Sequence, residues 1–373
     1  MRRLIRDDYA LLTPPGLIPL VAPALIFKAG PGAYGDIKSR GFAEERIGTI
    51  AGASGGAKWL VLSQLDKVIV SRLLPKLSGP VHLLGSSIGA WRLAAYARAR
   101  PLATIELFEE MYIEQRYSDK PDAAEISRVG REFIEKLIGE EGAAEIVSNP
   151  QLRLHVLSVL CHHLTASDKR PVLGAGLLAA IATNFVSRSA LRMFFSRALF
   201  FDARDLPPFY NAPGFPMERI RLTTENMGDA IASSGSIPMV LEGVRDIVGA
   251  RPGTYRDGGL IDYHLDLQTS DPDRLTLYPH FFDWLKPGWF DRQLPWRQVD
   301  PRHTDRTILM CPSPAFIASL PNAKVPDRTD FVNYTADERI RIWREVIERC
   351  KQLAEELNDV LDKDLLAARL QRL

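Results

Sequence analysis

The sequence predicts an α/β protein with a mainly parallel central sheet flanked by helices. The first observation is a rhythm: apolar segments at 24–28, 47–51 and 81–84 alternate with helical segments, and each apolar segment ends in a glycine-containing turn. The second is composition. The 373 residues are 46% hydrophobic and 25% charged, which excludes a disordered chain or a small disulfide-rich domain and allows a large core.

Further along the chain, residues 102–148 are helical and charged and are expected to form flanking helices. Residues 151–160 alternate and are rich in β-formers, and 197–201 and 307–310 predict two more strands, of which the latter is the last buried one. The C-terminal segment predicts a long amphipathic helix that packs on the body, because its apolar residues recur at helical spacing: Ile340, Trp343, Ile347, Cys350, Leu353, Leu357 and Leu361.

These elements predict three parts of the chain. Residues 1–44 form an N-terminal extension with the first strand. Residues 45–265 form the main domain, with helical insertions at about 102–148 and 170–195. Residues 266–373 form an irregular loop region followed by the long helix, which covers the main domain.

The charge balance of 47 basic against 46 acidic residues gives no electrostatic reason to expect a nucleic-acid partner. Cys161, Cys311 and Cys350 are an odd number without CxxC spacing, so structural thiols in a reducing compartment are expected. Asp7, Asp8 and several prolines interrupt the apolar N-terminal stretch, and no signal peptide is predicted. A cytoplasmic protein is therefore expected.

The most hydrophobic internal segment is 172–186. It is shorter than the ~20 residues that cross a bilayer, and it contains Asn184. A buried helix is the favoured interpretation. Peripheral contact with a membrane surface is the alternative.

Three glycine-rich turns follow the first three predicted strands. The first, AGPGAYG at 29–35, matches GxGxxG, but a dinucleotide site also needs an acidic residue at the end of the second strand. Residues 47–57 contain no acid, and Glu44 and Glu45 precede that strand. Nucleotide binding is therefore not expected.

The other two turns match GxSxG, with Ser54 between Gly52 and Gly56 and Ser87 between Gly85 and Gly89. In this pattern a strand enters a sharp turn and a helix follows, so that the serine hydroxyl is exposed above the sheet. Small residues are also frequent in ordinary strand-to-helix turns. Either serine is a candidate nucleophile.

Two further segments make the pattern more specific. Residues 255–262 read YRDGGLID, with Asp257 followed by Gly258 and Gly259, and residues 229–238 read DAIASSGSIP. Together with a GxSxG turn, these segments resemble the patatin-like phospholipase family over about residues 45–265. The resemblance implies a three-layer patatin-like fold in which this range is the catalytic domain.

The resemblance also implies a Ser–Asp dyad, in which Asp257 takes the serine proton and no histidine, metal or organic cofactor is needed. The expected partner is a lipid or another acyl-ester substrate. This chemistry is reasonable, since a shielded carboxylate is a stronger base than an exposed one. Backbone N–H groups of a glycine-rich loop would stabilise the oxyanion.

Ser87 is the preferred nucleophile. In that assignment Gly55, Gly56 and Ala57 belong to the oxyanion loop, and a helix at 59–74 and the strand at 81–84 fill the interval to Gly85. The competing assignment uses GPGAYG as the oxyanion loop and Ser54 as the nucleophile. It leaves the second GxSxG turn unexplained.

Two basic residues near these turns have open roles. Lys58 beside the oxyanion loop and Arg92 after the elbow are each expected either at a solvated helix surface or at an acidic headgroup.

The nearest enzymatic rival is a Ser–His–Asp triad using His264, His280 or His303, none of which follows a convincing final strand. His162 and His163 lack acidic or cysteine partners at metal-binding spacing apart from Cys161, so structural roles are preferred. A patatin-like protein that binds lipid or protein with weak or no catalysis is the alternative of a different class.

Overall fold

The computed structural model describes residues 22–269 and 271–373, so most of the N-terminal stretch considered for a signal peptide lies outside the described residues. The described chain folds around one eleven-stranded mixed sheet. Its strands are β1 (Leu25–Ala29), β2 (Ile47–Gly52), β3 (Val81–Ser86), β4 (Leu152–Cys161), β5 (Phe195–Phe201), β6 (Met217–Arg221), β7 (Val244–Arg245), β8 (Thr254–Asp257), β9 (Leu275–Pro279), β10 (Thr307–Pro312) and β11 (Leu370–Arg372).

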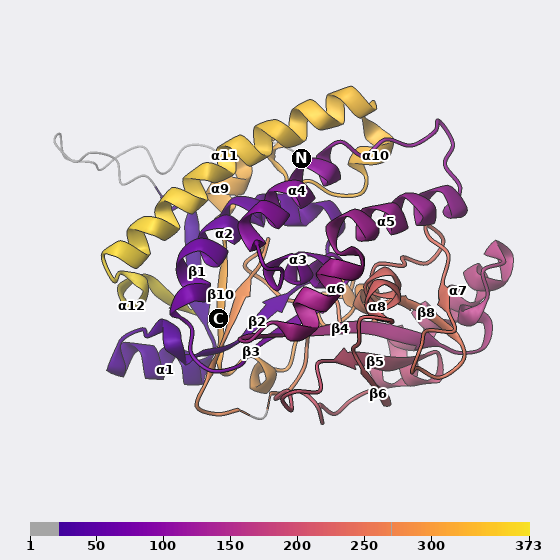
Figure 1. The fold of residues 1–373 in the computed structure, drawn as a ribbon, viewed down its shortest axis with the longest axis horizontal. Helices are drawn as coiled ribbons and strands as arrows, with labels where there is room; N and C mark the ends of the chain where they lie inside the picture. The colour runs from indigo at the N-terminus through magenta and orange to yellow at the C-terminus, as the bar shows by residue number, and fades with distance from the viewer. Residues whose placement is uncertain (1–21, 270) are drawn as a thin grey trace, which may run out of the picture.

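The main path of the sheet is β11-β1-β10-β9-β2-β3-β4-β5-β6, with β8 on β4 and β7 on β8. Six of the strand pairs are parallel, including the run from β10 through β9, β2 and β3 to β4. The predicted α/β fold with a mainly parallel sheet is confirmed. Figure 1 shows β1 beside β10, two strands from opposite ends of the sequence.

The apolar segments predicted as strands all form strands, and five further strands were not predicted: β6, β7, β8, β9 and β11. β6 and β11 each bury only one residue, and they lack the apolar alternation that identifies a strand. β8 is only four residues long and ends at Asp257. β9 is five residues long, and an irregular segment rich in aromatic residues follows it directly. We call this segment, residues 280–300, the aromatic loop.

Helices cover the sheet (Figure 1). They are α1 (Pro31–Arg40), α2 (Ser63–Val68), α3 (Ile88–Tyr96), α4 (Pro101–Ile113), α5 (Ala123–Leu137), α6 (Gly139–Ser148), α7 (Arg170–Val186), α8 (Met227–Ser234), α9 (Pro314–Ser319), α10 (Asp330–Asn333), α11 (Ala336–Asp362) and α12 (Leu366–Arg369). The flanking helices expected at 102–148 correspond to α4, α5 and α6.

The two faces of the sheet are covered differently because side chains alternate along each strand. Leu83, Val156 and Phe200 pack in the large core that includes α2, α3, α4, α8 and α11. On the opposite face, neighbouring residues such as Leu84 and Leu157 pack against loop residues. Towards the end of β4 this second face is covered by α7.

The C-terminal helix α11 packs along the body, as predicted. A capping box at Thr335 and Glu338 starts it, because each side chain accepts from the other residue's backbone N–H. Its buried side includes Trp343, Cys350 and Leu357. Trp343 also donates a 3.0 Å hydrogen bond to Asp330 of α10.

Arg92 is not at a surface, so both expectations for it are wrong. It lies on α3, is 1% exposed and forms an ion pair of 2.7 Å with Asp66 of α2. Tyr96 donates a 2.7 Å hydrogen bond to the same carboxylate. Although the guanidinium lowers it, burial dominates and raises the pKa of Asp66 to about 6.

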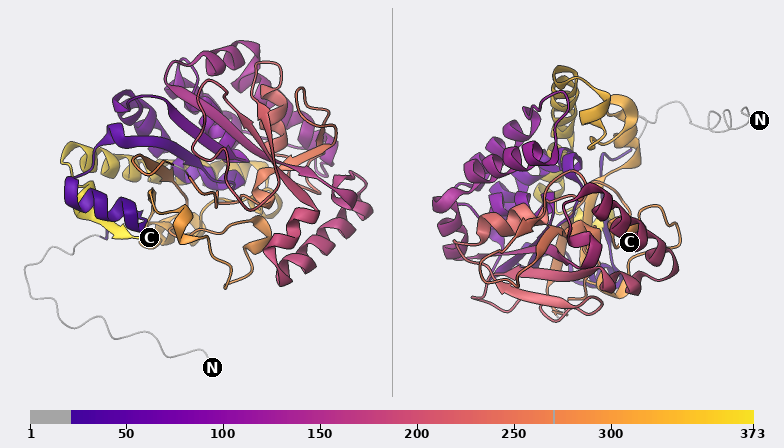
Figure 2. Two further views of the ribbon diagram at one scale, coloured as in Figure 1. Left: turned by 90° about the horizontal axis from the view of Figure 1, so that it is seen from below. Right: turned by 90° about the vertical axis from the view of Figure 1, so that its right-hand side faces the viewer.

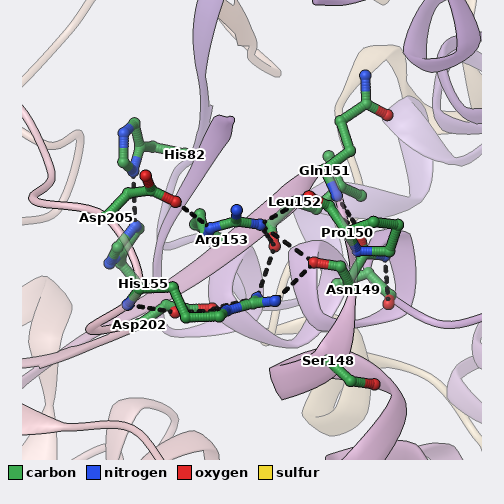
Figure 3. A network of polar contacts seen from close by, with 12 residues as sticks. His82, Ser148, Asn149, Pro150, Gln151, Leu152, Arg153, His155, Asp202 and Asp205 are labelled. Atoms are coloured by element: carbon green, nitrogen blue, oxygen red, sulfur yellow. Dashed lines mark hydrogen bonds and ion pairs between the residues drawn. The ribbon is translucent and has the colours of Figure 1, made fainter. Parts of the chain in front are cut away.

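Another polar network lies at the opposite end of β4 from the glycine-rich turns (Figure 3). There Arg153 donates to the carboxylate of Asp205 and to the carbonyls of Asn149, Pro150 and Leu152. These contacts attach the loop after β5 to the start of β4.

The expectation that residues 172–186 form a buried helix is also wrong. It forms α7, but the helix is not buried: Leu178 is 68% exposed and Phe185 is 62% exposed. α7 lies at the periphery of the molecule (Figures 1 and 2). Across residues 22–269 and 271–373, no helix combines the length and apolar character needed to span a bilayer. The three cysteines are free and buried.

Replacing Arg92 with leucine should strongly destabilise the fold, because the Asp66 carboxylate stays buried without its cation. We expect a loss of about 3–5 kcal/mol in the free energy of unfolding, measured by urea denaturation. Arg344→Leu is the control, since this residue pairs with Glu110 and Glu114 at the surface and should cost less than about 1 kcal/mol. Equal losses would contradict this account.

Candidate active site

Two strands meet end to end on β4. β3 runs parallel to β4 and its last residue, Ser86, pairs with Leu157. β8 runs antiparallel to β4 and its last residue, Asp257, pairs with Ser158. Because these partners are consecutive residues of one strand, the ends of β3 and β8 converge.

Ser87 occupies the turn between β3 and α3. Its backbone has φ 55° and ψ −132°, a conformation unusual for a residue with a side chain, as expected of a sharp strand-to-helix elbow. The flanking glycines permit the turn. A Cβ on Gly85 would lie 2.4 Å from Ala90 Cα, and one on Gly89 would lie 2.0 Å from the carbonyl oxygen of Gly52.

The structure brings Ser87 and Asp257 into contact. Ser87 Oγ donates a 2.6 Å hydrogen bond to Asp257 Oδ2. The other carboxylate oxygen, Oδ1, accepts a 2.7 Å hydrogen bond from the backbone N–H of Gly259. Gly258 and Gly259 follow in a tight turn, in which a Cβ on Gly259 would lie 2.5 Å from Ser54 Oγ. Glycine follows Asp257 at both positions because a side chain there would collide with neighbouring residues.

Asp257 is a poorly solvated carboxylate. Burial raises its pKa from 3.8 to about 6, while the hydrogen bonds from Ser87 and Gly259 oppose this change. A base whose pKa lies near neutrality is better suited to accepting a proton than an ordinary aspartate is.

The end of α8 holds both members of this pair. Ser234 Oγ accepts the backbone N–H of Ser87 at 2.8 Å and donates to the carbonyl of Leu157 at 2.6 Å. The carbonyl of Ser236 accepts the backbone N–H of Asp257 at 3.0 Å. The segment ASSGSIP was noted in the sequence only for its resemblance. In the structure it positions the backbones of both residues.

The loop proposed to bind an oxyanion lies beside the serine. Gly55 and Gly56 line the same cavity as Ser87, whereas Ala57 is 1% exposed and is not part of the lining. Gly56 has φ +56° and begins the 3₁₀ helix η2 (Gly56–Leu62). Within the described part of the chain, no hydrogen bond uses the backbone N–H groups of Gly55, Gly56 or Ala57.

Ser54 has different surroundings from Ser87. Its hydroxyl is buried and donates a 3.0 Å hydrogen bond to Ser86 Oγ, not to a carboxylate. The GPGAYG turn is remote from it, because β10 and β9 separate β1 from β2. That turn is also occupied, since Gly32 N–H donates to Asp305 Oδ1 at 2.8 Å. The geometry therefore favours Ser87.

A cavity of about 590 Å³ opens at the pair, within the range of small-molecule sites. One part of its wall is apolar. This part consists of Leu177, Ile237, Pro238, Met239, Val240, Leu260, Tyr263 and Trp289.

The cavity wall also carries three cations, Lys58, Arg292 and Arg328, and, besides Asp257, one further carboxylate, Asp327. Burial lowers the pKa of Lys58 to about 8, with a contribution from Arg292. Lys58 therefore does not lie on a solvated helix surface. It forms no ion pair with any of the described residues. Sequence analysis missed both arginines, because they lie in the C-terminal region where no motif marks them.

The histidines considered for a triad are held elsewhere. His264 Nδ1 accepts the backbone N–H of Lys286, His280 contacts the Phe282 carbonyl, and His303 pairs with Asp266. Asp257 contacts Ser87 and Gly259 instead. Among residues 22–269 and 271–373, no three His, Cys, Asp or Glu side chains are grouped closely enough to hold a metal ion.

No protein-family model and no curated protein sequence matches the chain. A search of solved structures finds VipD from Legionella pneumophila at 10% identity and a TM-score of 0.31, covering 65% of this chain and 51% of VipD. The chain thus spans about half the length of VipD. Functional inference rests on the geometry of the site.

Replacing Asp257 with asparagine should stabilise the fold at alkaline pH. The raised pKa of Asp257 means that the folded state binds its proton more tightly, so this group costs stability as pH rises from about 4 to 6. The shift corresponds to about 3 kcal/mol. In urea denaturation, we expect the free energy of unfolding of Asp257→Asn to exceed that of the wild type by up to this amount at pH 8, and by much less near pH 4. A variant less stable than the wild type at pH 8 would contradict this assignment.

Proposed function

We propose that the protein is a serine hydrolase that cleaves acyl esters of lipids through a dyad of Ser87 and Asp257. The observation that carries this proposal is the 2.6 Å hydrogen bond from Ser87 Oγ to a buried carboxylate at the wall of a large cavity. The order of motifs, which resembles that of patatin-like phospholipases, supports the same chemistry.

In the first step, Ser87 Oγ attacks the ester carbonyl carbon while its proton passes to Asp257 Oδ2. The tetrahedral intermediate then collapses, the acyl–oxygen bond breaks, and Asp257 returns the proton to the departing alkoxide. A water molecule next attacks the acyl-enzyme, with Asp257 again taking the proton. The second tetrahedral intermediate collapses, the bond between the acyl carbon and Ser87 Oγ breaks, and Asp257 returns the proton to Ser87 Oγ. The products are the fatty acid and the alcohol released in the first step.

The negatively charged oxygen of each tetrahedral intermediate must be stabilised by hydrogen-bond donors. Gly55 and Gly56 lie beside Ser87, and their backbone N–H groups are unused within the described residues, which suits them to this role. Ala57, also expected in the oxyanion loop, would act by holding the turn. The apolar wall of the cavity suits an acyl chain.

The three cations suit an anionic headgroup, because they line the same cavity as Ser87 and charged donors bind phosphate oxygens strongly. Lys58 is the cation adjacent to the oxyanion loop. This arrangement favours phospholipids over neutral esters.

A fluorophosphonate probe tests the nucleophile. We expect covalent labelling of the wild type and of Ser54→Ala, and no labelling of Ser87→Ala, as measured by intact-protein mass spectrometry. Circular dichroism checks that each variant is folded. Labelling that persists in Ser87→Ala and vanishes in Ser54→Ala would show that the assignment is wrong. A folded wild type that is neither labelled nor active on esters would instead favour a binding protein.

Replacing Lys58 with glutamine should weaken binding of charged substrates selectively. We expect KM for a soluble short-chain phosphatidylglycerol to rise about tenfold, since a hydrogen bond to a charged group is lost. KM for p-nitrophenyl butyrate should stay within about twofold. Lys351→Gln, on the exposed side of α11, is the control and should leave both constants unchanged. Equal changes for both substrates in Lys58→Gln would contradict a role in headgroup binding.

A further inference from the structure

The exposed side of α7 is apolar along its whole length. Its buried side, at Leu173, Gly176, Ala180 and Asn184, packs on the body of the protein. Beyond the first two residues, every exposed position of the helix holds an apolar side chain, at Ala175, Leu178, Ile181, Ala182, Phe185 and Val186. We call this set the α7 face. The exposed side of a surface helix normally carries polar and charged residues.

The apolar surface continues beyond the helix. Trp296, in the aromatic loop after β9, is 59% exposed, and its ring packs edge-on against Phe185 at 5.6 Å between centroids. Arg297 ties this loop to α7 by a 2.9 Å hydrogen bond to the carbonyl of Asn184. Contiguous exposed apolar residues mark interaction sites, whereas isolated ones are ordinary. An exposed tryptophan at such an edge suits the interface between water and lipid.

Within the chain segment that contains α7, the charged residues are of one sign. Residues 169–200 contain five lysines and arginines and no aspartate or glutamate. Arg188 and Arg197 are paired with Asp291 and Asp262. Lys169, Arg170 and Arg192 form no ion pair with any described residue. An apolar face flanked by unpaired cations is complementary to a lipid layer, whose acyl chains are apolar and whose headgroups are anionic.

The same helix forms part of the proposed active site. Leu177, next to Leu178 in sequence, lines the cavity that contains Ser87, together with Trp289. One side of α7 thus faces the cavity wall while its outer side faces solvent.

We propose that the α7 face, with Trp296, docks on a lipid surface containing anionic phospholipid. Docking places α7 at the boundary between the acyl chains of the lipid and the cavity. The inference rests on the proposed function in one respect, that the lipid is also the substrate. Binding itself needs no catalysis, so it is measured in the Ser87→Ala protein.

The test is co-sedimentation of full-length Ser87→Ala with vesicles of an equal mixture of phosphatidylcholine and phosphatidylglycerol. Adding Leu178→Glu and Phe185→Glu should lower the partition coefficient at least about tenfold, because two charges would enter the apolar region. Leu206→Glu is the matched control. Leu206 is 70% exposed, close to the 68% of Leu178, and follows β5 at the opposite end of that strand from α7. It should leave binding unchanged.

Absence of vesicle binding, or equal binding by the α7 and control variants, would overturn the inference. So would self-association of the wild type that is lost in the α7 variant, since a second copy would then cover this face. An enzyme that hydrolyses soluble esters without binding vesicles would refute the docking alone. Binding that depends on α7, in a protein without esterase activity, would instead refute the proposed function.

Discussion

The candidate active site depends on one feature of strand pairing: β4 is longer than β3 and longer than β8, the two strands that share one of its edges. β3 pairs with the first half of β4 and β8 with the second half, in opposite directions, so that both end at its middle. Hydrogen bonds of the sheet thereby fix the backbone positions of Ser87 and Asp257, which are 170 residues apart in sequence. Rigid strands position reacting groups more accurately than loops.

This arrangement has an energetic cost that is concentrated at the site. Ser87 is held in a strained backbone conformation, and Asp257 is a carboxylate with little access to water. The end of α8 offsets part of the cost by hydrogen-bonding both backbones. A free hydroxyl and a solvated carboxylate would be more stable, but they would be a weaker nucleophile and a weaker base.

Local patterns were sufficient to predict the buried strands, α11 and the glycine-rich turns, because these follow from apolar periodicity and from crowding. They were insufficient for β6 and β11, whose residues are largely exposed, and for Arg92, whose partner Asp66 is defined only by tertiary packing. The apolar composition of residues 172–186 predicts a buried helix, whereas α7 is exposed on one side, because hydrophobicity alone does not reveal exposure. For the site, the motifs identified Ser87, Asp257 and Gly55, whereas Arg292 and Arg328 reach the cavity from a segment without any motif.

The central claim is that the Asp257 carboxylate is the base that activates Ser87. The most direct measurement is the pH dependence of the acylation rate, followed by rapid mixing with a chromogenic ester. Because protonated Asp257 accepts no proton, the account predicts a rate that rises with pH through about 6 and is constant above it. The rise should be absent in Asp257→Asn, whose rate should be lower by about 10²–10⁴-fold. The same rise in Asp257→Asn would contradict the account, since another group would then be the base.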